Sequence, residues 1–90
     1  MEVIIKGANI YNKEDFHQQV AQLLNLSGYY GENLDALWDS LINDLQRSVT
    51  VIWEDFNLSK IQLGEFANKA RSVFEDADKD NNIKLKFICA

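Results

Sequence analysis

Asp35 and Asp39 are the first residues in this sequence whose type and spacing could do chemistry. They stand at i and i+4 in a segment with helical spacing, on the side away from its leucines and Trp38, so both carboxylates should point outward. Like charges at this spacing destabilise a helix by ~0.2–0.5 kcal/mol. Asp44 follows near the C-terminal end, where the helix dipole disfavours a negative charge. This pattern favours a binding function, with an ordinary solvated helix face as the alternative.

The geometry of this pair disfavours catalysis. Catalytic carboxylates face each other across a cleft, whereas two residues on the exposed side of one helix do not. We expect His17, the single histidine, to lie on the polar, solvated side of its helix, and Cys89, the single cysteine, to be a buried, inert thiol. The sequence contains no phosphate-loop, dinucleotide-binding or nucleophilic-serine motif. We therefore expect no catalytic residue, no cofactor and no enzyme. A carboxylate-dependent hydrolase would need a metal or a histidine near the two aspartates.

The run from Asp76 to Asp80 has the spacing of the first three ligands of a calcium loop. The sixth position of that loop would be Asn81 in place of glycine, and the twelfth would be Phe87 in place of the bidentate glutamate. The following residues alternate like a strand. A helix that ends in a turn is the better interpretation, and no metal site is expected.

Charge is distributed unevenly along the chain, whose net charge is −5. No lysine or arginine lies between Lys13 and Arg47, and this stretch holds six acids, so it carries more negative charge than the whole chain. An unmixed acidic segment suits a cationic partner and argues against direct binding to nucleic acid or to an anionic membrane. Chance in a short acidic protein is the alternative.

Length and composition predict one globular domain over residues 1–90. The chain is 47% hydrophobic and 26% charged, and its start lacks the basic leader and cleavage site of a signal peptide. No apolar run approaches the roughly 18 residues of a membrane helix. A lone cysteine cannot form an internal disulfide, which favours a reducing compartment. We expect a cytoplasmic protein that is monomeric when free.

Strands and helices are expected to alternate. Apolar runs at residues 3–5 and 49–53 predict buried strands, the second of them central, and the alternation over 83–87 predicts an edge strand with one wet face. Apolar residues at helical spacing over 16–24, 34–45 and 66–77 predict three helices, the first two capped by Asn12 and Asn33. A further short helix should begin at its cap, Asp55, and end at Gly64. The long crossovers predict an α/β fold, with a three-stranded parallel sheet and four helices in the order β-α-α-β-α-α-β.

Two adjacent tyrosines, Tyr29 and Tyr30, lie in a loop between Gly28 and Gly31, directly before the acidic helix. Tyrosine offers a large, stiff contact area that interfaces favour. Each tyrosine alone could simply cover the core. Next to the carboxylates, they favour a surface that binds a partner.

The eleven residues from Tyr29 to Asp39, YYGENLDALWD, resemble the central motif of the barstar family. Looser similarity spans the whole chain and includes Trp53, Phe56, Ser59–Lys60 and Phe74. The resemblance implies a barstar-like fold and a stoichiometric inhibitor of a cationic, barnase-type bacterial ribonuclease, either extracellular or a toxin. Such an immunity protein, or antitoxin, blocks the active site of the enzyme with its second helix and the loop before it.

The resemblance also implies roles for individual residues. Asp39 would stand in for the substrate phosphate and meet arginines and a histidine of the enzyme. Asp35 would accept hydrogen bonds beside it, and Tyr29 would pack on the catalytic histidine. Asn33 and Leu34 would line the same surface.

Three further positions depart from the family pattern. Asp76 matches a contacting glutamate of the family and is one methylene shorter, while Asn43 and Asp44 stand where barstar-type sequences carry glycine and tryptophan. The shorter side chain of Asp76 reduces its reach, and the departures at Asn43 and Asp44 imply a different cognate enzyme. The alternative within the binding class is an acidic mimic of nucleic acid that occupies some other basic protein.

Overall fold

The computed structural model describes residues 1–26, 30–45, 47–80 and 84–90. Strands β1 (Glu2–Lys6), β2 (Val49–Glu54) and β3 (Leu85–Cys89) form a parallel sheet in the order β1-β2-β3. In register, Val3 lies opposite Val51, which lies opposite Phe87. With four α-helices in the described part of the chain, this arrangement confirms the predicted α/β fold, with β2 central and β3 at an edge.

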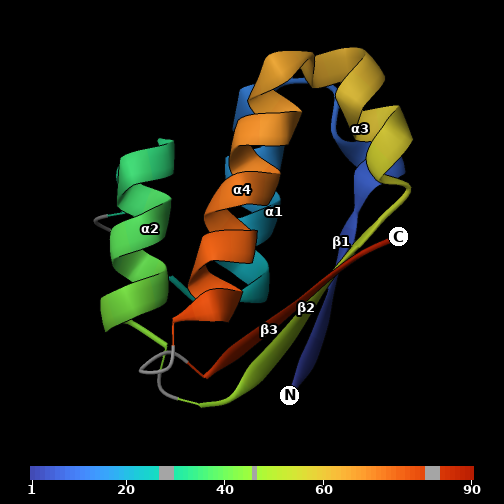
Figure 1. Cartoon of the computed structure of the whole chain (residues 1–90). Helices are drawn as coiled ribbons and strands as arrows, with labels where there is room; N and C mark the ends of the chain where they lie inside the picture. Colours follow the sequence, from blue (N-terminus) through green and yellow to red (C-terminus); the bar gives the residue numbers. More distant parts are fainter. Residues whose placement is uncertain (27–29, 46, 81–83) are drawn as a thin grey trace.

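Helices α1 (Lys13–Leu23) and α4 (Glu65–Lys79) cover one face of the sheet, and α2 (Leu34–Asn43) lies farther out, beside α4 (Figure 1). The short helix α3 (Phe56–Leu63) follows β2 and contacts both α4 and the 3-10 turn η1 (Gly7–Asn9). None of the helices in the described ranges is long and apolar enough to cross a membrane. The layering leaves α2 free to present its outer side to solvent.

The core forms around Trp53 on β2. Residues of β2 alternate between buried (Val49, Val51, Trp53) and partly exposed, as a strand with one face against helices requires. The Trp53 ring is fully buried, with ring centroids of Phe16, Phe56 and Phe74 at 5.2, 5.0 and 6.4 Å. Aromatic pairs at these distances add stability beyond the area that they bury.

A buried chain of hydrogen bonds joins three elements next to this aromatic cluster. Trp53 Nε1 donates to Ser59 Oγ at 3.0 Å, and Ser59 Oγ donates to the carbonyl of Gly7 at 2.9 Å. A Cβ atom at position 7 would lie 2.2 Å from the Glu54 carbonyl oxygen, so the close approach of β1 and β2 requires glycine. This junction fixes the carboxyl ends of β1 and β2 against α3.

The predicted caps of α1 and α2 are confirmed, and Asp55 occupies the predicted cap position of α3 without a capping hydrogen bond. Asn12 Oδ1 accepts from the Asp15 amide, and Asn33 Oδ1 from the Ala36 amide, both at 2.8 Å. Asp55 makes no side-chain cap bond, because it adopts a left-handed conformation (φ 53°) in the tight turn from β2 into α3, which aspartate tolerates. The expected end of α3 at Gly64 is confirmed.

Two predictions about single side chains are wrong. His17 is 3% exposed, because Tyr30 and Phe66 cover the flank of α1 that its own sequence pattern marks as polar. Cys89 is exposed, because it ends an edge strand whose burial falls from Leu85 onward. The helical interpretation of the run that begins at Asp76 is confirmed, since α4 continues to Lys79. Residue 83, the predicted start of the third strand, lies outside the described residues.

Candidate partner-binding site

The entry into α2 is fixed by local hydrogen bonds. Besides accepting from Ala36, the Asn33 side chain donates to the Gly31 carbonyl oxygen at 3.3 Å. Glu32, between them, adopts a left-handed backbone conformation (φ 52°). The chain therefore turns sharply and starts the helix at Leu34, which sets the direction in which the first carboxylate projects.

The inner side of α2 packs on the protein, and its outer side is acidic. Leu37 and Leu41 are fully buried, and α2 contacts α4. Asp35 and Asp39 are exposed. Neither carboxylate makes a hydrogen bond or an ion pair with any residue that the structure describes. The two charges are thus held in place by the helix and are left available to a partner.

A groove of about 400 Å³ runs between α2 and α4. Its carboxylates come from both helices, Asp35 and Asp39 from α2 and Asp76 from α4. Its apolar lining consists of three partly buried side chains: Leu34, Trp38 and Val73. We call these six residues the acidic groove.

The acidic groove has the chemistry to receive a cationic side chain. Its lining contains three acids and no base, so the carboxylates reinforce one another in attracting positive charge. Arginine buries its aliphatic stem on apolar and aromatic surface while its guanidinium pairs with carboxylates, and the mixed lining suits both parts. Within the described ranges, no group of three or more histidines, cysteines, aspartates or glutamates is placed to hold a metal ion.

A second hollow of about 250 Å³ adjoins the acidic groove, with Leu34 in both linings. It is lined by one side chain from α4 and by residues of α1 and of the entry into α2: Phe66, Lys13, Glu14, His17, Glu32, Asn33 and Leu34. The predicted residues Asn33 and Leu34 therefore lie at the boundary between the two hollows.

His17, which lines this second hollow, contacts Tyr30. The imidazole Nδ1 lies 2.5 Å from the tyrosine hydroxyl, and the rings meet edge to face. Burial lowers the pKa of His17, against the opposing influence of the Glu32 and Glu14 charges. Burial, together with the charge of Glu32, raises the pKa of Tyr30. Both shifts favour the uncharged form of each ring.

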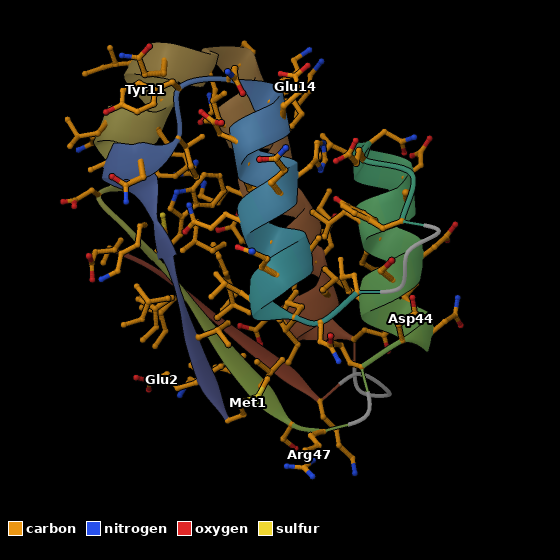
Figure 2. All side chains as sticks on the ribbon, turned by 180° about the vertical axis from the view of Figure 1, so that it is seen from behind. Met1, Glu2, Tyr11, Glu14, Asp44 and Arg47 are labelled. Atoms are coloured by element: carbon orange, nitrogen blue, oxygen red, sulfur yellow. The ribbon has the colours of Figure 1, made fainter. Side chains whose placement is uncertain are left out.

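The structure brings four of the eight predicted site residues together in the acidic groove: Leu34, Asp35, Asp39 and Asp76. Asn33 borders it, and Asn43 is exposed in the last turn of α2. Asp44 lies at the other end of the helix, where it lines a separate hollow with Leu45 and Arg47 (Figure 2). Tyr29 lies outside the described residues.

Sequence reasoning missed Trp38 and Val73 as groove residues. Both belong to the apolar stripes that predict their helices and so indicate a side turned to the core, yet each is partly exposed at the edge of its stripe. A signal was available for Trp38, because it stands beside Asp39 and three residues after Asp35 and so flanks the acidic side. For Val73 the sequence offers no such signal, because its exposure depends on how α4 packs against α2.

Sequence comparison identifies the family. The sequence model described as Barstar (barnase inhibitor) matches residues 1–90. The chain belongs to the barstar family. One similar protein is the Bacillus subtilis (strain 168) protein named "Putative ribonuclease inhibitor YrdF", which is 32% identical over 87 residues. That match covers 97% of this chain and 96% of the relative. The resemblance of the motif from Tyr29 to Asp39 to this family is thus confirmed at the level of the whole chain.

Proposed function

We propose that this protein is a stoichiometric inhibitor of a barnase-type ribonuclease and blocks the active site of that enzyme with α2 and the segment before it. Membership of the barstar family and similarity to a protein named as a ribonuclease inhibitor support the coarse function. The observation that carries the mechanism is the acidic groove, in which two helices place three carboxylates around an apolar floor.

The chemistry of the target explains why such a groove would inhibit it. A ribonuclease must hold the phosphates of RNA, so its active site is cationic. Carboxylates at fixed positions can take the place of those phosphates, and they cannot be cleaved. Binding then removes the enzyme from use without any reaction on the inhibitor.

Asp39 is the central phosphate mimic in this proposal, because it lies in the middle of α2 and has no internal partner among the described residues. Asp35 and Asp76 flank it in the groove and accept hydrogen bonds from neighbouring arginine or lysine side chains. Leu34 and Trp38 supply apolar contact. Tyr29, Asn33, Asn43 and Asp44 complete the proposed surface on the strength of the family resemblance.

The partner is proposed to be extracellular or a toxin, and the inhibitor to act as an immunity protein, monomeric when free, in the cytoplasm of the cell that makes the enzyme. A cell that produces an active ribonuclease needs protection where its own RNA is. The acidic segment also speeds encounter with a cationic enzyme.

Titration of a barnase-type ribonuclease with the purified protein tests the proposal. We expect RNA cleavage to fall linearly to zero at one inhibitor per enzyme, and a mononucleotide that fills the active site to compete. An unrelated cationic ribonuclease and a basic protein without nuclease activity serve as controls. Tight binding to these controls without inhibition of the first enzyme would instead indicate a general acidic mimic of nucleic acid.

A further inference from the structure

His17 lies beneath the segment that leads into α2 and ties it to α1. Its side chain is 3% exposed, its Nδ1 atom lies 2.5 Å from the Tyr30 hydroxyl, and the two ring centroids are 5.5 Å apart. Tyr30 directly precedes the residues from Gly31 to Asn33 that start the helix. The position of this imidazole is therefore coupled, through one side chain, to the start of the helix that carries Asp35 and Asp39.

Charged and titratable groups face the His17 ring from two sides. Lys13 and Glu14 lie on its own helix, and Tyr30 and Glu32 lie in the segment before α2. From α4 the ring meets Phe66, which is uncharged, with centroids 5.8 Å apart. The surroundings contain negative charge, yet burial has the larger influence and lowers the pKa of His17.

The closed geometry therefore disfavours protonation of the His17 ring. The second hollow, about 250 Å³ in volume, includes His17, Glu32 and Phe66 in its lining. If Tyr30 moves away from the ring, water can enter through this hollow and hydrate a charged imidazole, which removes the cost of burial. The closed position of Tyr30 and the neutral ring therefore favour each other.

We propose that His17 is a positioning residue of this inhibitor, whose neutral ring holds Tyr30 and the entry of α2 in the binding geometry and whose protonation releases them. The inference rests on the proposed function and adds a regulation to it: inhibition weakens in mildly acidic solution.

The direction of the pH dependence of inhibition follows from proton linkage. The closed form has a pKa below the ordinary value of 6.5, so it binds fewer protons than the open form and is favoured as the pH rises. The stability of the closed form relative to the open form is greatest above pH 6.5. It is lost as the pH falls from 6.5 through the lowered pKa of His17. The ratio of the two proton affinities sets the largest possible loss of binding, which is tenfold for each unit that separates the two pKa values.

The single histidine makes the free protein easy to test. The Hε1 proton of its ring gives one resonance in an NMR pH titration of the free protein, and selective isotope labelling of the inhibitor keeps it distinct in the complex. We expect a midpoint below 6.5 in the free inhibitor and a lower one still in the complex, where the partner holds the segment closed. A midpoint at or above 6.5 in the free protein would overturn the inference.

The functional test compares the wild type with His17→Gln, which keeps a hydrogen-bonding side chain for Tyr30 and cannot titrate. Between about pH 7.5 and about pH 5.5, the dissociation constant of the wild type should rise about three- to tenfold more than that of the variant. The difference between the two profiles cancels the titration of the ribonuclease itself. Circular dichroism at both pH values checks that each protein is folded.

Each outcome has one meaning. Parallel pH profiles for the wild type and His17→Gln would overturn the positioning function and leave the proposed inhibition intact. A wild type that fails to inhibit at every pH would overturn the proposed function itself. If His17→Gln does not fold, the wild-type midpoints decide, because an equal midpoint in the free protein and the complex contradicts the inference.

Discussion

Helices α2 and α4 pack against each other and differ in how their charges are arranged. Helix α4 begins with Glu65 and ends with Lys79, in accord with the helix dipole, and Arg71 pairs with Glu75 one turn later at 3.8 Å. Helix α2 contains no base at all. Its two aspartates repel each other at i, i+4, and Asp44 stands at the C-cap, where the dipole opposes it.

The comparison distinguishes charges that stabilise their own helix, as in α4, from charges that do not, as in α2. In α4 an ion pair and charges that suit the helix dipole support the helix, although Asp76 faces the acidic groove, whereas in α2 the repulsion between Asp35 and Asp39 and the position of Asp44 at the C-cap destabilise the helix. The proposed function accounts for this arrangement, because a cationic partner would supply the missing positive charge. The acidic groove lies on the boundary between these two helices and takes most of its charge from α2.

The largest expected effect is on inhibition by Asp39→Ala. Buried charged anchors at interfaces are worth about 2 kcal/mol or more, so the dissociation constant for the ribonuclease should rise at least roughly thirtyfold. The fold should persist, because Asp39 makes no ion pair or hydrogen bond among the described residues. Inhibitor titration and a thermal melt measure the two quantities.

Glu2→Ala is the matched control for that experiment. Glu2 is an exposed carboxylate on β1, on the opposite side of the molecule from α2 (Figure 2). Its removal changes the net charge by the same amount and should leave the dissociation constant within about twofold, as for a rim charge of little energetic weight. Equal losses in both variants would mean that net charge, and not the acidic groove, governs binding.

The next effect is on association kinetics. The rate constant should fall about tenfold or more from low to high ionic strength, because salt screens the field of the acidic segment, while dissociation changes less. Stopped-flow mixing measures both. Asp35→Asn should flatten the salt dependence of association and Glu75→Gln on α4 should not. A salt-independent association rate would argue against steering by α2.

A smaller effect is expected on the stability of the free protein. Asp39→Lys converts a repulsive i, i+4 pair with Asp35 into an attractive one, a gain of ~0.4–1 kcal/mol in the free energy of unfolding at low salt. Asp44→Lys should add a few tenths, ~0.3 kcal/mol, by suiting the C-terminal end of the dipole. Urea midpoints measure both gains, which should shrink at about 1 M salt. A lower midpoint for Asp39→Lys would reveal an internal partner, and retained inhibition would place the binding surface elsewhere.

The smallest effect is the converse change in α4. Glu75→Gln removes the partner of Arg71 and should lower the free energy of unfolding by ~0.2–0.5 kcal/mol at low salt, with no change in inhibition. Loss of an acid would thus destabilise α4, whereas loss of an acid stabilises α2. If Glu75→Gln raised the urea midpoint instead, the contrast between the two helices would not hold.

Much of the fold could be predicted because its signals are local. The β-branched run from Val49 to Trp53 and the capping residues Asn12 and Asn33 act through neighbours in sequence, and the structure confirms each of them. Long-range packing is where prediction failed. His17 is buried by Tyr30 and Phe66, which are 13 and 49 positions away, and periodicity within α1 carries no information about them.

The candidate site shows the same division. Asp35 and Asp39 could be chosen from spacing alone, because their places on α2 follow from one helical period. Asp76 entered through family resemblance, since nothing in its own segment indicates that α4 packs beside α2. Trp38 was assigned wholly to the core, because a stripe of apolar residues does not reveal which member lies at its edge.

The junction at Gly7 has a consequence for how such inhibitors can evolve. Any side chain at position 7 would collide with the backbone that joins β2 to α3, and the hydrogen bonds from Trp53 through Ser59 end on its carbonyl. Substitutions at this junction should therefore prevent folding, whereas the exposed acids of α2 can be replaced one at a time without loss of the fold. If α2 is the binding surface, as proposed above, point mutations on α2 can adapt a duplicated gene to a different ribonuclease while the rest of the architecture stays unaltered.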